Sequence, residues 1–386
     1  MQNTNLPPFH DHHTHVSFYA SLSGTADLSS CTSEKEALEI LRQRKKGVIF
    51  ARGWKNNLYD FSSSELDNLP PVAISNISLH CFRINKKARD VFAVKNPEIV
   101  SHLDDQEWVE HNLNAVFGMI ADYGGTEKIA SFISEMEKIG LYEMEDMSVC
   151  SEKAAEYMAV NYPGRIKIWA ALESYQKFTY AQKYINGIKL FADGALGAYS
   201  AALSVPCKGG NPSCLLRNDD DMRAAIRLAA ECKPEIAIHA IGDAAISQIL
   251  RCIKDLFGNC PNGREGVPLV RLEHIQMIMA EQAEQAKKMG IVLSMQPNFS
   301  LDSEAYSDRL PPDYIQANNP FRMLIDEAGF IPGRDLLFGS DGMPHGAEFA
   351  VKCATNPPLP SQRLSMEELA AGYVANFYKN SQLWKD

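Results

Sequence analysis

Eight short runs of apolar or β-branched residues are distributed along the chain, and each ends in a polar side chain. Strands of a parallel barrel have this pattern, because their carboxyl ends deliver polar side chains to one rim. The runs occupy residues 6–15, 141–149, 166–172, 185–193, 235–243, 269–276, 291–299 and 335–341. Helical patterns lie between several of them, at residues 151–160, 219–231 and 280–290. This alternation predicts an α/β fold, a (β/α)8 barrel of the TIM type.

The segment between the first two runs, about residues 16–140, is too long for a single crossover connection. It contains strand-like runs of its own at 47–54 and 71–78, followed by helical patterns near 105–122 and 126–139. We therefore expect an α+β lid subdomain, about residues 40–110, inserted after the first barrel strand. No repeat, low-complexity tract or linker divides the chain, so residues 1–386 are expected to form a single barrel domain that includes this insert.

Charge and cysteine usage narrow the class of protein. The 48 acidic and 38 basic residues give a net charge of -10, which argues against nucleic acids and other polyanions as partners. The nine cysteines are widely spaced with no C-x-x-C pair, so neither a disulfide framework nor a zinc ribbon is indicated. No signal peptide or membrane-spanning run is apparent. We expect a cytoplasmic protein with a small-molecule substrate and no membrane partner; a homo-oligomer is compatible with this composition.

The segment FHDHHTH near the start of the chain contains the first candidate metal ligands. His13 and His15 are two residues apart in an extended segment, so both side chains are expected on the same face, where they can bind one metal ion. His10 and His12 are then expected on the opposite face and need bind nothing. The alternative interpretation is a solvated, histidine-rich tail.

Three later strand ends add candidate ligands. His239 ends the run EIAIH and His274 ends LVRLEH. Either histidine alone is more often structural, but together with the first pair they form a set that zinc and related metals prefer. Asp341 closes LLFGSD in a tight turn. It is either an ordinary turn aspartate or a weak metal ligand that serves as the general base.

Lys189 lies in the strand-like run GIKLF, where a charged side chain is costly. One interpretation is an ion pair with Asp193. Alternatively, a buried lysine with a lowered pKa reacts with carbon dioxide, and the resulting carbamate can bridge two metal ions. The sequence thus indicates one or two divalent ions, with zinc expected, and carbon dioxide as a possible modifying group.

The order H-x-H, Lys, His, His, Asp along eight strand-like runs resembles the amidohydrolase superfamily. Its family-3 branch is the most similar in local sequence, through FHDHHTH, KLFADGALGAYSAAL, IHAIGDAAI, RLEHIQ, SMQPNF and GSDGMP. ARGW at 51–54 and the stretch around His80 and Asn85 resemble the lid of that branch. Two departures are Pro8 and Tyr199, which stand where a glycine and an arginine are usual. The β-sandwich that usually flanks the barrel of that branch is also not apparent.

The resemblance implies a divalent-metal barrel and a role for each candidate residue. The implied ligands are His13, His15, His239 and His274, with Lys189 as a carboxylated bridge and Asp341 as ligand and proton shuttle. His80, Asp193 and Gln296 are implied to lie near the cavity, in contact with substrate.

The expected activity is metal-dependent hydrolysis of an amide-type or other carbon–nitrogen bond, other than a peptide bond, in a small molecule. Asp341 would accept the proton of the attacking water and pass it to the leaving nitrogen. One alternative is a mononuclear deaminase or cyclic-amide hydrolase in which Lys189 stays unmodified. An alternative of another class is a non-catalytic metal-binding barrel, which the missing β-sandwich motivates.

Overall fold

The computed structural model describes residues 8–44, 47–77, 81–105, 108–109, 112–149, 151–207, 215–258 and 267–373. The chain forms two compact units. The first consists of Met1–Val16 and Ile133–Asp386, and the second of Ser17–Phe132. Each unit has its own sheet.

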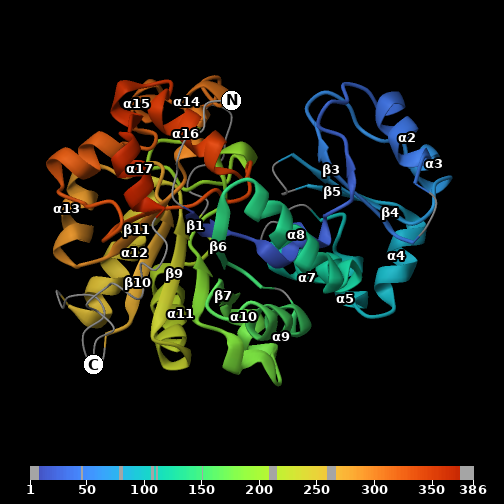
Figure 1. The fold of residues 1–386 in the computed structure, drawn as a ribbon, viewed down its shortest axis with the longest axis horizontal. Helices are drawn as coiled ribbons and strands as arrows, with labels where there is room; N and C mark the ends of the chain where they lie inside the picture. Colours follow the sequence, from blue (N-terminus) through green and yellow to red (C-terminus); the bar gives the residue numbers. More distant parts are fainter. Residues whose placement is uncertain are drawn as a thin grey trace. The chain divides into compact units, whose positions relative to one another are not determined.

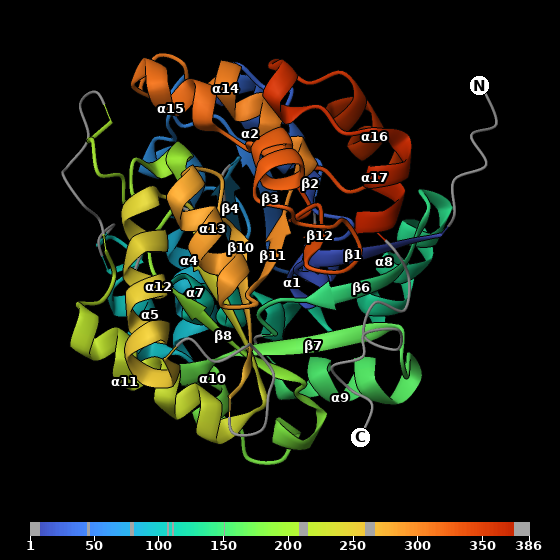
Figure 2. The ribbon, with the colours of Figure 1, turned by 90° about the vertical axis from the view of Figure 1, so that its left-hand side faces the viewer.

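The sheet of the first unit contains eight strands, and each coincides with one of the eight predicted runs. They are β1 (Phe9–Thr14), β6 (Leu141–Asp146), β7 (Ile166–Ala171), β8 (Gly187–Phe191), β9 (Glu235–Ala240), β10 (Leu269–His274), β11 (Val292–Met295) and β12 (Leu336–Phe338). They pair in this order, and every pair is parallel. Figure 2 shows α11, α12 and α13 on the outside of these strands. The predicted (β/α)8 barrel is confirmed.

The helices of the first unit mostly follow a strand, as the barrel pattern requires. Those before β11 are α9 (Glu152–Asn161), α10 (Leu172–Lys177), α11 (Asp219–Cys232), α12 (Asp243–Phe257) and α13 (Ala280–Lys288). After β11 come α14 (Asp302–Ala305), α15 (Pro312–Ala317), α16 (Ala347–Thr355) and α17 (Met366–Gly372). Short turns are η1 (Ala181–Tyr184), η2 (Leu196–Ala198), η3 (Pro297–Leu301), η4 (Met323–Glu327) and η5 (Pro360–Gln362). A capping box is present at α17, where Ser365 and Glu368 each accept the other's backbone N–H.

The second unit is an α+β structure with a core of its own. Its strands, in sheet order, are β2 (Ala26–Asp27), β3 (Ile49–Trp54), β4 (Val72–Asn76) and β5 (Phe82–Ile84); β2, β3 and β4 pair in parallel, and β4 and β5 pair antiparallel. Figure 1 labels β3, β4 and β5. Its helices are α1 (Val16–Ser21), α2 (Glu34–Arg42), α3 (Ser63–Asp67), α4 (Lys86–Ala93), α5 (Pro97–Ser101), α7 (Leu113–Gly124) and α8 (Glu127–Lys138). The first residue of α1 and the last residues of α8 belong to the first unit. Leu41, Trp54 and Val72 are among its buried core residues.

The insert expected at about residues 40–110 lies within this second unit. The two strand-like runs predicted there form β3 and β4. The helical pattern near 126–139 forms α8, whereas α7 begins only at Leu113, later than the pattern near 105–122 indicated. Across the described parts of the chain, we find no helix with both the length and the hydropathy needed to cross a membrane.

The first and last barrel strands meet at a seam that depends on one glycine. The backbone N–H of Asp341, which follows β12, donates to the carbonyl of His13 in β1 at 2.7 Å. A Cβ atom added to Gly339 would lie 2.4 Å from the backbone nitrogen of His13, far inside van der Waals contact. The close approach of the two strands therefore requires a residue without a side chain at this position.

We predict that Gly339→Ala lowers the free energy of unfolding by about 1–3 kcal/mol, because the added methyl group forces the seam apart. Gly339→Val is expected to cost more, since its side chain is larger and stiffer. Urea unfolding of the two variants beside the wild type measures both losses. Unchanged unfolding midpoints in both variants would show that the seam tolerates side chains.

Candidate metal centre

The six predicted ligands all belong to the first unit and lie in or just after its strands. His13 lies in β1 and His15 follows it, Lys189 lies in β8, His239 in β9, His274 ends β10, and Asp341 follows β12. The carboxyl ends of parallel barrel strands meet at one rim, so these residues are brought to the same end of the barrel.

Five of the six side chains converge. The ring centroid of His274 lies 4.5 Å from that of His13 and 4.4 Å from that of His239. The ring of His15 lies 5.6 Å from that of His13. One carboxylate oxygen of Asp341 is 3.2 Å from Nε2 of His15 and 3.7 Å from Nε2 of His13. The structure thus places together four imidazoles and a carboxylate that are separated widely in sequence.

Lys189 is buried within the same cluster. Its side chain is 1% exposed, and its Nζ atom has no hydrogen-bond partner among the residues described. Burial lowers the pKa of Lys189 to about 8, against the opposing effect of the Glu273 and Asp341 carboxylates. The alternative ion pair with Asp193 is not formed, because that carboxylate accepts backbone N–H groups of Ile241 and Gly242 instead.

The donors fit a divalent metal ion. The Nε2 atom of His13 is buried and has no hydrogen-bond partner in the described part of the chain. Burial holds the pKa values of His13 and His274 well below the usual range, so both imidazoles are neutral, as metal ligation requires. Imidazole nitrogens with a carboxylate suit zinc, iron, manganese or nickel.

Each of three candidate ligands has an outer partner that orients its ring. Nδ1 of His13 lies 2.6 Å from Glu273 Oε2, and Nδ1 of His274 lies 2.8 Å from Gln296 Oε1. Nε2 of His239 lies 2.9 Å from the carbonyl oxygen of Gly194. Because these oxygens accept, the facing nitrogens carry the proton and the other ring nitrogens keep a lone pair for a metal. The sequence reasoning missed Glu273, although it directly precedes His274 in RLEH.

Two of the three residues expected to touch substrate are buried beside candidate ligands. Gln296 is fully buried and contacts His274. Asp193 is 1% exposed, accepts backbone N–H groups from the neighbouring loops and lies 3.5 Å from His239 Nε2. Contact of these two side chains with a substrate stays a prediction. His80 lies outside the described residues.

Two candidate ligands have a strained backbone. His274 and Asp341 adopt φ values of 70° and 53°, in the left-handed region that residues with a Cβ rarely occupy. Each costs on the order of 1–2 kcal/mol relative to an ordinary conformation. Such strain is typical of functional sites, where it aims a side chain that a regular strand would direct elsewhere.

The prediction that His10 and His12 lie on the face opposite His13 does not hold, whereas the prediction that they need bind no metal ion is not tested. Both are buried, their rings stack at 3.9 Å, and His12 Nδ1 lies 2.9 Å from Glu145 Oε1. The reason is a register shift in β1, because Asp11 pairs with Met144 and Thr14 with Asp146, so that β1 has one extra residue between these two pairs. Strict alternation of faces therefore ends before His13.

His10, His12 and Glu145 also lie close enough together to hold a metal ion. However, the Glu145 carboxylate already accepts hydrogen bonds from the Arg271 guanidinium at 3.0 Å and from Trp169 Nε1 at 2.7 Å. A permanent positive charge at that distance disfavours a second cation. This cluster is therefore part of the internal packing of the barrel, and the cluster of His13, His15 and Asp341 is the better metal site.

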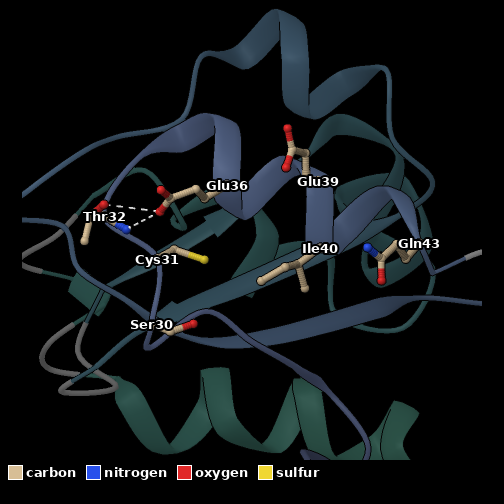
Figure 3. A pocket seen from close by; sticks show the side chains of 7 residues that line it. All are labelled: Ser30, Cys31, Thr32, Glu36, Glu39, Ile40 and Gln43. Carbon is tan, nitrogen blue, oxygen red and sulfur yellow. Dashed lines mark hydrogen bonds between the residues drawn. The ribbon is translucent and has the colours of Figure 1, made fainter.

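A surface pocket of about 380 Å³ lies in the second unit (Figure 3). It is lined by Ser30, Cys31, Thr32, Glu36, Glu39, Ile40 and Gln43. The Glu36 carboxylate there accepts the backbone N–H and the hydroxyl of Thr32 at 2.7 and 3.2 Å. None of the predicted site residues lines this pocket, and its best-placed carboxylate is occupied by a local contact, so it is not a candidate for the chemistry.

Comparisons with known proteins give a family for the chain and relatives of the same fold. The Amidohydrolase family matches residues 2–368. YtcJ from Bacillus subtilis (strain 168), named as a candidate amidohydrolase, is 26% identical over 369 residues, covering 83% of this chain and 68% of YtcJ. An uncharacterized metal-dependent hydrolase from Pyrococcus furiosus shares the fold, with a TM-score of 0.72, 21% identity, and coverage of 97% of this chain and 82% of that chain. Another from Pyrococcus horikoshii OT3 has a TM-score of 0.74, 20% identity, and coverage of 97% and 80%.

The barrel and the ligand-type residues at its rim define the class as a metal-dependent hydrolase. The chain belongs to the Amidohydrolase family.

Asp11 fixes the segment that carries Asp341. Its fully buried carboxylate accepts the backbone N–H and the hydroxyl of Ser340 at 2.9 and 2.5 Å, and the backbone N–H of His13 at 3.2 Å. Burial raises the pKa of Asp11 from 3.8 to about 7. The folded protein thus binds this proton more tightly than the unfolded chain does. The resulting stabilisation is complete at low pH and is lost as the pH rises through about 7.

Asp11→Asn removes this titration and keeps the contacts, because the amide carbonyl accepts both N–H groups and the amide N–H₂ donates to the Ser340 hydroxyl. We predict that the wild type loses about 2–3 kcal/mol of stability relative to Asp11→Asn between pH 5 and pH 8. Urea unfolding of both metal-free proteins across this range measures the difference. A difference that stays constant with pH would mean that Asp11 is already ionised in the fold at pH 5.

Proposed function

We propose that the chain hydrolyses an amide-type or other carbon–nitrogen bond, other than a peptide bond, in a small molecule. The observation that supports this most directly is the convergence of four imidazoles and the Asp341 carboxylate at the carboxyl rim of the barrel. His13, His15, His239 and His274 would hold the divalent ion, for which zinc is our expectation. When bound, such an ion polarises a substrate carbonyl and lowers the pKa of a water molecule.

Asp341 is the candidate general base. Its side chain is 16% exposed, so it can meet both solvent and the ligand cluster, and its oxygen lies 3.2 Å from His15 Nε2. In the proposed reaction its carboxylate accepts a proton from the attacking water. It then donates that proton to the leaving nitrogen, which departs as a neutral amine.

Lys189 is the candidate for a carbamate bridge between two ions. With a pKa of about 8, a useful fraction of its amine is neutral near physiological pH. The amine nitrogen would bond to the carbon of carbon dioxide and lose a proton, giving an anionic carbamate in place of a cation. Its burial supports this role, and so does the lack of a hydrogen-bond partner for Nζ among the described residues, because burying a charged ammonium group without such partners is costly.

The small-molecule substrate and the cytoplasmic location are part of the same proposal. The location rests on the wide spacing of the cysteines and on the free thiols of Cys31, Cys232, Cys252 and Cys353.

We predict that the metal-loaded protein hydrolyses at least one member of a panel of N-acyl amines, formamides and cyclic amides, and that chelation of the metal abolishes this activity. Asp341→Asn is expected to lower kcat by about 10²–10⁴-fold, because the amide cannot accept the water proton. Steady-state kinetics and metal analysis measure both effects. If no panel member is hydrolysed and Asp341→Asn leaves metal binding unchanged, the non-catalytic barrel becomes the better account.

Matched histidine variants locate the ion. His15→Asn should lower the metal content, whereas His10→Asn should leave it unchanged, because His10 belongs to the cluster that Arg271 occupies. A metal content near two ions per chain, together with activity that depends on carbon dioxide, would support the carbamate at Lys189. A metal content near one ion per chain, together with an intact protein mass that shows an unmodified lysine, would instead support the mononuclear deaminase or cyclic-amide hydrolase.

A further inference from the structure

Arg271 occupies the interior of the barrel and joins two carboxylates. Its side chain is 2% exposed and lies in β10, two residues before Glu273, so both side chains are on the same face of the strand. Its Nε atom donates to Glu273 Oε1 at 2.5 Å. One terminal nitrogen donates to both oxygens of Glu145 at 3.0 and 3.1 Å, and the other donates to the backbone carbonyl of His12 at 3.0 Å. The guanidinium is therefore held from several sides.

Glu273 passes this constraint to the metal centre. Its side chain is fully buried, and its two oxygens face different partners, Arg271 through Oε1 and His13 Nδ1 through Oε2. Because the carboxylate is planar, fixing Oε1 on the guanidinium also fixes the direction of Oε2. A carboxylate oxygen can only accept, so His13 carries its proton on Nδ1 and presents the lone pair of Nε2.

We propose that Arg271 is a positioning residue for the metal ligand His13, acting through Glu273 to set the tautomer and orientation of the imidazole. This inference deepens the proposed function, on which the identification of His13 as a ligand rests. Glu145 completes the arrangement, since it accepts from a terminal nitrogen of the guanidinium while Glu273 accepts from Nε. The chain from Glu145 through Arg271 and Glu273 to His13 is buried throughout.

The hydrogen bonds around Glu273 predict which tautomer His13 adopts in Glu273→Gln. Arg271 Nε needs an acceptor, so the amide oxygen takes the position of Oε1 and the amide N–H₂ group faces His13 Nδ1. That nitrogen must then accept, and the proton moves to Nε2, the nitrogen needed for the metal. Arg271→Lys keeps the positive charge but loses the planar fork, and one ammonium group cannot satisfy Glu145 and Glu273 in the same way.

Glu235→Gln is the matched control. Glu235 is also a buried interior carboxylate paired with a cation, Lys167, but it contacts no candidate ligand. The same chemical change at this position should leave His13 unaffected.

The test has two readouts on the full chain. The first is the ¹⁵N chemical shifts of the His13 imidazole in metal-free, histidine-labelled protein at pH 8, assigned with His13→Asn. We expect an Nδ1–H tautomer in the wild type and Glu235→Gln, and an Nε2–H tautomer in Glu273→Gln. In Arg271→Lys the Glu273 carboxylate is free to turn away from His13 Nδ1, so we expect a tautomer mixture. The second is zinc affinity by competition with a chromophoric chelator. We expect about 10–100-fold weaker binding in Glu273→Gln and Arg271→Lys, and a change under twofold in Glu235→Gln.

The double variant shows whether Arg271 acts through Glu273. If it does, adding Arg271→Lys to Glu273→Gln weakens zinc binding by no more than about twofold further. Additive losses, or a wild-type tautomer and affinity in Arg271→Lys, would overturn the inference. The tautomer measurement needs no metal, so it tests the role of Arg271 even if the wild type binds no zinc. Failure of the wild type to bind zinc would count against the proposed function instead. Circular dichroism confirms that each variant is folded before it is compared.

Discussion

The backbone hydrogen bond from Asp341 to the carbonyl of His13 joins the last barrel strand to the first, and the metal centre depends on it. The two residues are more than 300 positions apart in sequence, and no local propensity brings them together. The bond forms because Gly339 lets the strands approach and because Asp11 binds Ser340 beside it. A base from one end of the chain is thereby placed next to ligands from the other.

The interior of the barrel is the second feature that shapes the site. Many barrels of this kind fill their interior with branched apolar side chains. Here the interior contains charged side chains that pair with one another or with neighbouring histidines, namely Glu145, Lys167, Glu235, Arg271 and Glu273. Buried ion pairs are seldom a gain in stability over apolar packing. Their orientation is fixed, however, and a fixed carboxylate behind a metal ligand sets which imidazole nitrogen faces the metal.

Much of the fold was predictable from the sequence, because strands buried on both faces appear as short apolar runs that end in polar residues. The eight barrel strands, β3 and β4 all follow such runs. By contrast, β2 and β5 have only two and three residues, too few for a pattern. The ligand set could be proposed because each member ends or follows a strand. The roles of Arg271 and Glu145 could not be predicted, since their contacts join strands that are distant in sequence. The error at His10 and His12 arose from the register shift in β1, which the sequence does not reveal.

The most direct measurement for the central claim is a crystal structure of zinc-loaded protein with anomalous scattering recorded at the zinc edge. Our account predicts an anomalous peak within bonding distance of the imidazoles of His13, His15, His239 and His274, with density extending beyond Nζ of Lys189 if two ions are bound. A zinc peak beside His10, His12 and Glu145, or no peak at the rim of the barrel, would contradict it.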